Sequence, residues 1–307
     1  MVEVETSEKY TVEWCNAQPK FRPGISLLCW AYNEELLIED YLRRANAMLE
    51  RHAEDYEIVV VDDCSTDRTN EVVQGLIKEM PQIRLLRNET NRNVGYSSQR
   101  AIKSAGKEFL FWQTIDWSYD ITLLRAFLHL LETHDVVAGV RRAPVQVVDH
   151  FWFIKPVRVI LSLFGIKHIT RRSDTIRKAF VSIINYCLVR FLFGVPLSDF
   201  QNVVFYSSKL VQSIDYESDS SFSNPEGLLK AHWKGASIVE VPISFLPRQK
   251  GVAKGTRLSA IFSSITDILR LWFRWVVLGK REYSGKGTIR RLIPDEWESA
   301  SGDQSEG

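Results

Sequence analysis

The stretch that decides the fold runs from Glu57 to Arg68 and reads Glu-Ile-Val-Val-Val-Asp-Asp-Cys-Ser-Thr-Asp-Arg. A β-branched run without polar alternation is typical of a parallel strand covered on both faces, so we predict a buried strand over 57–62. The run ends on Asp62 and Asp63. Because ligands of open α/β sheets bind beyond the carboxyl ends of such strands, the same stretch predicts a site as well as a fold.

The rest of the N-terminal half repeats this pattern of a strand followed by a helix. Strand and helix pairs are predicted at 24–29 with 33–51, 57–62 with 67–80, 82–86 with 96–105 and 107–112 with 120–133, before a further strand at 135–140. Such alternation favours βαβ units and a mostly parallel α/β sheet flanked by helices. Right-handed crossovers would bring the strand ends to one edge of the sheet.

The composition is that of a globular protein, with 307 residues, 45% of them hydrophobic and 25% charged. The four cysteines show no CxxC spacing, so neither a zinc site nor a disulfide framework is indicated, and a reducing cytosol fits best. The N-terminus lacks the pattern of a signal peptide, and no uncharged apolar stretch is long enough for a transmembrane helix. We therefore expect a cytoplasmic protein.

Charge is distributed unevenly, because eleven Lys and Arg residues between Arg248 and Arg291 face only two acidic ones. Within this quarter a helix is predicted over 259–278, and a broad apolar face on it lies opposite three charged residues. That apolar face comprises Ile261, Ile265, Ile268, Leu269, Trp272 and Val276, and the charged residues are Asp267, Arg270 and Arg274. A basic amphipathic helix suits the inner surface of an anionic membrane, but packing on the sheet or in a homo-oligomer fits the periodicity equally well.

Further acidic residues follow the other strands. Glu34 and Glu35 come after the first strand, and Asp116 comes after the strand at 107–112. If these acids converge, a hard divalent cation, Mg²⁺ or Mn²⁺, bridging to phosphate oxygens would offset their charge. Helix capping is the alternative for Glu35, as it is for Asp67 and Asp120. The chain has neither GxGxxG nor a P-loop, which leaves a carboxylate-bound metal to hold a phosphate.

Four motifs together resemble the nucleotide-diphospho-sugar domain of family 2 glycosyltransferases, over about residues 24–250. They begin at Ala31 (Ala-Tyr-Asn-Glu-Glu), Val59 (Val-Val-Val-Asp-Asp-Cys-Ser-Thr-Asp-Arg-Thr), Asn93 (Asn-Val-Gly-Tyr) and Thr114 (Thr-Ile-Asp-Trp-Ser-Tyr-Asp). The resemblance implies a GT-A fold and a donor that is a UDP- or GDP-linked sugar. It assigns donor binding to Ala31, Tyr32, Glu34, Asp62, Asp63, Asn93 and Gly95.

The metal motif of that family, DxD, departs from its usual form here. It reads Thr114-Ile-Asp116, so a hydroxyl replaces the first carboxylate. The resemblance assigns the metal to Asp116 and Thr114. Losing one carboxylate should weaken metal binding, because the charge of the site sets much of its affinity.

The second half resembles the acceptor portion of dolichol-phosphate mannosyltransferases and of bacterial polyprenyl-phosphate glycosyltransferases. An RxxGxSK signature is nearly intact from Arg248 to Lys254, with Ala253 in the Ser place. This resemblance assigns binding of the acceptor phosphate to Arg177, Ser182 and Lys254. It assigns a catalytic role to Arg248, as well as to Asp116. A lipid phosphate is already ionised near neutral pH, so as nucleophile it requires cations rather than a general base.

The function that we predict is inverting, metal-assisted sugar transfer from a nucleotide-sugar to a polyprenyl- or dolichyl-phosphate at the inner face of the membrane, as in cell-envelope glycan biosynthesis. One alternative is transfer to a saccharide hydroxyl, for which Asp199 would be the base. Another is a catalytically weakened homologue that binds the nucleotide without turnover. No nucleic-acid motif is present, so no nucleic-acid partner is expected.

The extent of the family resemblance and the charge pattern predict four segments of the chain. They are a lead-in at 1–23, a GT-A domain at 24–250, a basic loop with the membrane or dimer helix at 251–291, and an acidic tail at 292–307.

Overall fold

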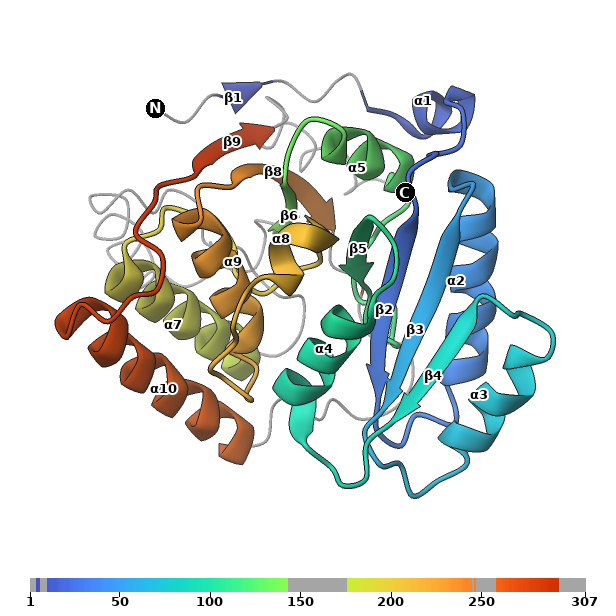
Figure 1. The fold of residues 1–307 in the computed structure, drawn as a ribbon, viewed down its shortest axis with the longest axis horizontal. Helices are drawn as coiled ribbons and strands as arrows, with labels where there is room; N and C mark the ends of the chain where they lie inside the picture. The colour runs from blue at the N-terminus through green and yellow to red at the C-terminus, as the bar shows by residue number, and fades with distance from the viewer. Residues whose placement is uncertain (1–3, 6–9, 143–175, 245, 247–257, 293–307) are drawn as a thin grey trace, which may run out of the picture.

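A computed structural model describes residues 4–5, 10–142, 176–244, 246 and 258–292 (Figure 1). These residues form one nine-stranded sheet with the order β1-β9-β8-β6-β7-β5-β2-β3-β4. The strands are β1 (Val4–Glu5), β2 (Ile25–Ala31), β3 (Tyr56–Asp62), β4 (Ile83–Arg87), β5 (Phe109–Trp112), β6 (Val136–Arg142), β7 (Val204–Ser207), β8 (Ser237–Ser244) and β9 (Thr288–Leu292). β7 runs antiparallel to β5 and β6, and the other paired strands are parallel.

Helices cover both faces of this sheet. They are α1 (Val12–Ala17), α2 (Ile38–His52), α3 (Thr69–Ile77), α4 (Asn93–Ser104), α5 (Leu124–Leu131), α7 (Ile176–Phe193), α8 (Ser208–Gln212), α9 (Ser223–Trp233) and α10 (Leu258–Trp272), which continues into the π-helical turn η3 (Phe273–Val277). Helices α2, α3 and α5 pack in one core layer, and α4, α7, α8, α9 and α10 pack in the other. The protein is therefore a three-layer α/β structure.

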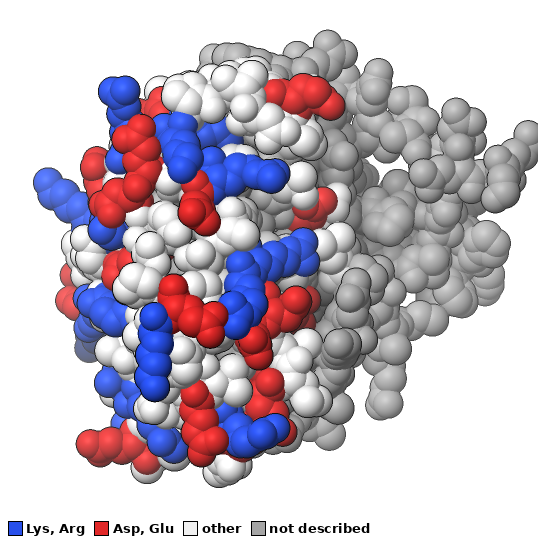
Figure 2. Space-filling model, turned by 90° about the vertical axis from the view of Figure 1, so that its right-hand side faces the viewer, with Lys and Arg blue, Asp and Glu red and all other residues white. Residues whose placement is uncertain are grey.

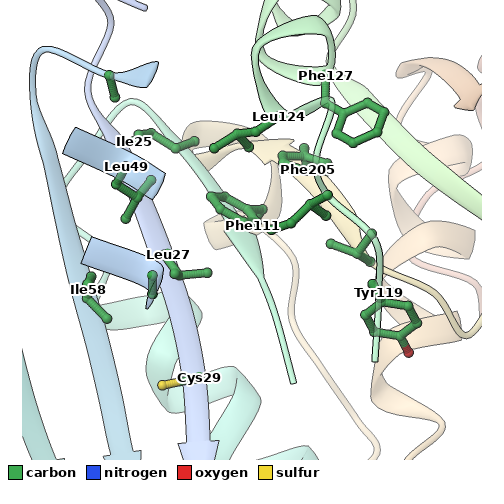
Figure 3. Packing of buried hydrophobic residues seen from close by; sticks show 14 of the residues in the cluster. Ile25, Leu27, Cys29, Leu49, Ile58, Phe111, Tyr119, Leu124, Phe127 and Phe205 are labelled. Carbon is green, nitrogen blue, oxygen red and sulfur yellow. The ribbon is translucent and has the colours of Figure 1, made fainter. Parts of the chain in front are cut away.

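The strand residues alternate between the two core layers. Leu27 of β2 points into the layer with α2 and α5, whereas the next residue, Leu28, points into the opposite layer. In the first layer Phe111 of β5 lies opposite Phe205 of β7, and their rings stack with centroids 4.6 Å apart (Figure 3). Such a pair contributes about 0.5–1.5 kcal/mol beyond its buried area, so it strengthens the antiparallel junction in the middle of the sheet.

The predicted series of strands and helices is confirmed through β6, and the sheet is mostly parallel as expected. Two details differ. The antiparallel strand β7 inserts between β5 and β6. In addition, α2 begins at Ile38 rather than at Asn33, because Glu34 O accepts hydrogen bonds from the backbone N–H groups of Leu37 and Ile38, both at 3.0 Å, and closes a turn first.

The sheet also extends past the predicted domain boundary at residue 250. Strand β9 pairs with β8, and its Ile289 and Leu292 are buried in the core. Its Arg291 donates to the buried Glu240 of β8 at 2.7 Å. The C-terminal segment thus contributes to the same core as the N-terminal strands, and the proposed domain division stays a prediction.

Candidate functional site

Each strand in the β5-β2-β3-β4 part of the sheet is followed, in its loop or at the first residue of the next helix, by one residue with left-handed backbone. These residues are Asn33 after β2, Cys64 after β3, Asn93 after β4 and Trp117 after β5, with φ angles of 53°, 62°, 66° and 53°. They are the non-glycine residues with positive φ in the part of the chain that the structure describes. Because the four strands are parallel, the loops share one edge of the sheet, and backbone strain of this kind clusters at ligand sites.

Hydrogen bonds lock the loops after β2 and β3 to one another. Asn33 N donates to Ser65 Oγ at 2.9 Å, and Thr66 N donates back to Asn33 Oδ1 at 2.8 Å. Glu34 N donates to Thr69 Oγ1 at 2.8 Å. The half-buried Tyr32 and Glu34, both predicted to bind the donor, therefore lie on a loop with a fixed backbone.

Three acids for which helix capping was the alternative to ligand binding accept hydrogen bonds from backbone N–H groups near helix starts. Asp67 Oδ1 accepts from the N–H of Thr69, the first residue of α3, at 3.0 Å, and Glu35 Oε2 accepts from Arg68 N at 3.1 Å. Asp120 Oδ1 accepts from Thr122 N at 3.0 Å in the turn before α5. The contacts of Asp67 and Glu35 fit the capping alternative, because they satisfy backbone N–H groups at the start of α3, whereas Asp120 closes a turn two residues before α5 begins at Leu124.

The paired acids Asp62 and Asp63 have different environments. Asp62 is fully buried, and its oxygens accept from Ser65 N at 2.9 Å and from Asn70 Nδ2 at 3.1 Å, with Arg87 Nε 3.5 Å away. Both of its oxygens are therefore used inside the protein. Asp62, which was predicted to bind the nucleotide, thus stabilises the loop after β3 through both of its carboxylate oxygens.

Asp63 keeps one carboxylate oxygen available. Its Oδ1 accepts from Asn88 Nδ2 at 2.6 Å and from Arg92 N at 2.9 Å, and its backbone N–H donates to Ala31 O at 2.8 Å. Within the described residues no donor is bonded to Oδ2. Asp63 therefore presents a single acceptor at the strand edge, next to the end of β2.

The Asn-Val-Gly motif starts α4, and its glycine is required by packing. A Cβ atom on Gly95 would lie 2.2 Å from the carbonyl carbon of Asp219. Gly95 N also donates to Asp219 O at 3.1 Å. The motif thus brings the start of α4, with Asn93 in its left-handed conformation, against the loop at 215–220.

The loop that follows β5 carries the predicted metal residues. Ser118 N donates to Thr114 Oγ1 at 3.0 Å, and Ser118 Oγ donates to Asp116 Oδ1 at 2.5 Å, so the turn draws both side chains toward Ser118. At its base Tyr41 Oη donates to Gln113 O at 3.2 Å, and burial raises the pKa of Tyr41 well above its ordinary value.

The oxygen atoms of Thr114 and Asp116 suit a single hard divalent cation. Magnesium in proteins is commonly held by one or two carboxylates together with substrate phosphates, and Asp116 supplies one carboxylate beside the Thr114 hydroxyl. Within the described residues no group of three or more His, Cys, Asp or Glu side chains forms a metal site. A cation here would take its remaining ligands from a bound diphosphate and from water.

The residues predicted for the acceptor are placed less completely. Asp199 is buried, and its Oδ1 accepts from Gln201 N at 3.0 Å. Arg177 and Ser182 belong to α7, but their side chains lie outside the described residues. Arg248 and Lys254 lie wholly outside them.

A buried ionic cluster on α9 was not predicted from the sequence. Lys230 Nζ lies 2.8 Å from Glu226 Oε1 and 3.2 Å from Glu217 Oε1, and it also donates to Asp215 O. Glu226 accepts in addition from Glu217 N and Ser218 N, at 2.8 and 3.0 Å. Burial raises the pKa of Glu226, while the Lys230 ammonium and the two N–H groups oppose that shift. The Glu-x-x-x-Lys spacing on one helix was the signal available in the sequence.

The same cluster fixes the C-terminal helix to the loop at 215–220. Ser218 Oγ donates to Asp267 Oδ2 at 2.6 Å, Arg274 NH1 lies 3.0 Å from Glu217 Oε2, and Trp275 Nε1 donates to Glu217 Oε1 at 2.9 Å. The charged side of α10 thus contacts the loop at 215–220, although the side chains of Arg270 and Arg274 stay half exposed. These contacts could not be read from the sequence, because the loop that supplies the partners is remote in the chain.

The apolar side of α10 is also divided differently from the prediction. Ser264, Ile268, Leu271 and Trp275 form the buried seam, so Ile268 packs in the core. An opposite stripe is exposed, which we call the outer stripe and which comprises Phe262, Leu269, Phe273, Val276 and Val277. The helix therefore packs on the protein and also presents an apolar surface.

Comparison with known proteins gives relatives of one kind. The chain is 24% identical over 260 residues to glycosyltransferase AglD of Haloferax volcanii, covering 82% of this chain and 38% of the relative. It is 30% identical over 138 residues to the dolichyl-phosphate beta-glucosyltransferase of Dictyostelium discoideum, covering 41% of this chain and 42% of the relative. The chain thus spans less than half the length of these curated relatives.

Solved structures share the fold. The mannosyltransferase PcManGT from Pyrobaculum calidifontis, in complex with GDP-Man and Mn²⁺, aligns with a TM-score of 0.53 at 16% identity over 88% of this chain and 74% of that one. Glucosyl-3-phosphoglycerate synthase from Mycobacterium tuberculosis, in complex with Mn²⁺, UDP and glucosyl-3-phosphoglycerate, aligns with a TM-score of 0.53 at 14% identity over 89% and 88%. These likenesses confirm the predicted GT-A architecture.

The family itself follows from the sequence match. A model described as "Glycosyl transferase family 2" matches residues 26–193, which is more than half of the chain. This range contains the four loops with left-handed residues and the Thr114-Ile-Asp116 turn. The chain therefore belongs to glycosyl transferase family 2.

Proposed function

We propose that the protein transfers a sugar, with inversion, from a nucleotide-sugar to the phosphate of a polyprenyl or dolichyl lipid. The observation that carries the donor half of this proposal is the strand edge where four loops with left-handed residues meet and where Asp63 keeps one carboxylate oxygen available. Solved structures of the same fold hold UDP or GDP-Man, which supports a nucleoside diphosphate as the ligand.

The donor would bind with its base near Asp63 and its diphosphate near Asp116. A carboxylate oxygen that lacks a protein donor suits a ring N–H of uracil or guanine. Asp116 and Thr114 would hold Mg²⁺ or Mn²⁺, which supplies positive charge to the leaving diphosphate when bound. Mn²⁺ or Mg²⁺ in structures of the same fold supports this assignment.

The acceptor half rests on the chemistry of the predicted cations. A lipid phosphate oxygen would attack the anomeric carbon in line, forming one C–O bond as the bond to the nucleoside diphosphate breaks and that group leaves with the electron pair. Since the phosphate is already ionised, no proton has to be removed from it. Arg177, Ser182, Arg248 and Lys254 are the side chains that we assign to binding and orienting it. The similarity to a dolichyl-phosphate beta-glucosyltransferase supports this acceptor.

A peripheral contact with the membrane would bring the protein to such a lipid. In the described residues no helix has the length and hydropathy to cross a bilayer. We assign the contact to the outer stripe of α10, together with the exposed Ile184 and Phe191 of the adjacent α7 (Figure 1). Arg270 and Arg274 follow stripe residues by one position and remain half exposed, so they flank the stripe with positive charge for anionic headgroups.

We place this contact at the cytoplasmic face. All four cysteines are free, which suits a reducing compartment.

The side of the molecule that carries α2 and α3 shows no apolar surface comparable to the outer stripe in this view, because Lys, Arg, Asp and Glu side chains are interspersed over it (Figure 2).

The transfer is tested by incubating the full chain with UDP- and GDP-sugars, Mn²⁺, and either a polyprenyl phosphate or a free saccharide. We expect release of a nucleoside diphosphate that depends on the lipid phosphate, and a product with inverted anomeric configuration. Release that depends on the saccharide alone would overturn the lipid acceptor. Nucleotide binding without release under any condition would indicate a homologue that binds without turnover.

The membrane contact is tested by flotation with vesicles of phosphatidylglycerol or of phosphatidylcholine. We expect binding to the anionic vesicles and its loss in the double variant Leu269→Glu/Phe273→Glu. Val12→Glu, which changes an exposed apolar residue on the distant α1, is the matched control and should float like the wild type. A stable dimer in sedimentation that the double variant dissociates would assign the stripe to a second subunit instead.

A further inference from the structure

Asn88 directly follows β4, as Asp63 directly follows β3. It connects Asp63 to α4 at the carboxyl edge of the strands, which we call the donor edge. It is buried, and its backbone N–H donates to Asp62 O at 2.8 Å, one residue beyond the end of β4. Its Nδ2 group donates to Asp63 Oδ1 at 2.6 Å and to the buried Ser97 Oγ at 3.0 Å. Both amide hydrogens are therefore used.

Arg100 determines which way this amide points. Its NH1 group donates to Asn88 Oδ1 at 2.5 Å and to Arg87 O at 2.8 Å. A guanidinium can only donate and an ionised carboxylate can only accept, so turning the amide over would oppose oxygen to oxygen and N–H to N–H. The amide orientation is fixed from both ends.

The consequence concerns the one available oxygen of Asp63. With Oδ1 held by Asn88 and by the N–H of Arg92, the carboxylate cannot rotate without breaking two charge-assisted hydrogen bonds. Oδ2 is thereby kept in one direction as an acceptor. A ligand that offers an N–H at that point finds its partner already oriented, which reduces the entropy lost on binding.

We propose that Asn88 and Arg100 are positioning residues that hold Asp63 as an oriented acceptor for a ring N–H of the donor's nucleobase. The inference rests on the proposed function, because it takes the ligand to be a nucleoside diphosphate. It adds that discrimination of the base depends on two residues that do not themselves contact the nucleotide.

The test compares a nucleoside diphosphate with its analogue methylated at the ring nitrogen, by calorimetry on the full chain with Mn²⁺. The pair is UDP with N3-methyl-UDP, or GDP with N1-methyl-GDP, whichever base the wild type binds. We expect the wild type to bind the unmethylated form about 10- to 100-fold more tightly, as a hydrogen bond to a charged group allows. In Asn88→Ala this ratio should fall toward one, through weaker binding of the unmethylated form only.

Matched variants separate positioning from folding. Ser97→Ala removes a partner of Asn88 that does not touch Asp63, so it should keep the ratio. Arg100→Met should lower the ratio, and Arg100→Lys, which can still donate to both oxygens, should restore most of it. The donor KM should rise in Asn88→Ala, while kcat at saturating donor should stay close to that of the wild type.

Two results would overturn the inference alone. One is equal weakening of both ligands in Asn88→Ala, which would indicate a merely structural role, and the other is a wild-type ratio near one. Failure of the wild type to bind either UDP or GDP would instead overturn the proposed function, and this inference with it.

Discussion

The donor edge and the C-terminal helix are both held by polar side chains, but the two regions use them differently. At the donor edge, short side chains bond to the backbone of the neighbouring loop, as Asn33 does with the loop after β3. Around α10, long charged side chains from three separate segments meet in a largely buried cluster centred on Glu217 and Lys230. The first arrangement orients a ligand site, whereas the second fastens a helix that also presents the outer stripe.

Breaking the buried ion pair should have the largest effect. Lys230→Met keeps the length of the side chain and removes its charge, leaving the fully buried Glu226 without its ammonium partner. Losing one partner of a buried pair costs about 3–5 kcal/mol. Urea denaturation should show this loss, whereas Arg43→Met, which removes the solvent-exposed pairs of Arg43 with Glu39 and Glu79, should change the stability far less.

The same variant should depend on pH in a defined direction. Burial already raises the pKa of Glu226 above its ordinary value, and removing Lys230 raises it further. The folded variant then binds a proton more tightly than its unfolded chain, so its stability falls as the pH rises toward the raised pKa. The deficit relative to wild type should be larger at pH 8 than at pH 5. Glu226→Gln added to Lys230→Met should recover part of the loss, and a loss below about 1 kcal/mol in the single variant would contradict the role of the pair.

Adding one methyl group at the junction of the two regions should have the next largest effect. In Gly95→Ala the new Cβ would lie 2.2 Å from the backbone of Asp219, and backbone atoms cannot move aside as a side-chain end can. We expect a loss of about 1–3 kcal/mol, as for overpacking in a core. Gly75→Ala is the matched control, because nothing lies within 4 Å of its Cβ and its site is inside α3, so it should gain about 0.5–1 kcal/mol. Equal thermal melting shifts in the two variants would be inconsistent with the close approach.

The contrast between the two regions also explains how much could be predicted from the sequence. The strand series and the grouping of loops at one edge were predictable because strands and their terminal polar residues are adjacent in the chain, as in Val61-Asp62-Asp63. Which of the two acids keeps an available oxygen was not, because that depends on Asn88 and Asn70 reaching them from other elements. The partners of Lys230 were hidden for the same reason, since they lie in a loop without regular periodicity.

Exchanging one oxygen for an amide nitrogen should separate the paired acids. In Asp62→Asn the nitrogen must face either Ser65 N–H or the donors of Asn70 and Arg87, so one buried donor loses its acceptor. This costs about 1–3 kcal/mol of stability. In Asp63→Asn the oxygen can stay on Asn88 and Arg92 while the nitrogen takes the Oδ2 position, so stability should change less but nucleotide affinity should fall about tenfold or more. Denaturation of both variants measures the change in stability, and calorimetry measures the change in nucleotide affinity. A larger loss of stability in Asp63→Asn than in Asp62→Asn would contradict the assignment of Asp62 to the structure and of Asp63 to the ligand.

Restoring the missing carboxylate of the metal turn should have the smallest effect of the four. In Thr114→Asp a carboxylate oxygen can accept the N–H of Ser118 as Thr114 Oγ1 does, so the turn need not change. A second negative charge beside Asp116 should raise the affinity for Mn²⁺ about tenfold, since ligand charge sets much of the affinity of such a site, and should lower stability slightly through repulsion when no cation is bound. Calorimetric titration of Mn²⁺ in the presence of saturating nucleoside diphosphate measures the first effect. Ser213→Asp, which adds the same charge at the end of α8, should leave Mn²⁺ binding unchanged. An unchanged affinity in Thr114→Asp would mean that position 114 does not face the cation, and that Asp116 alone carries the protein's share of its binding.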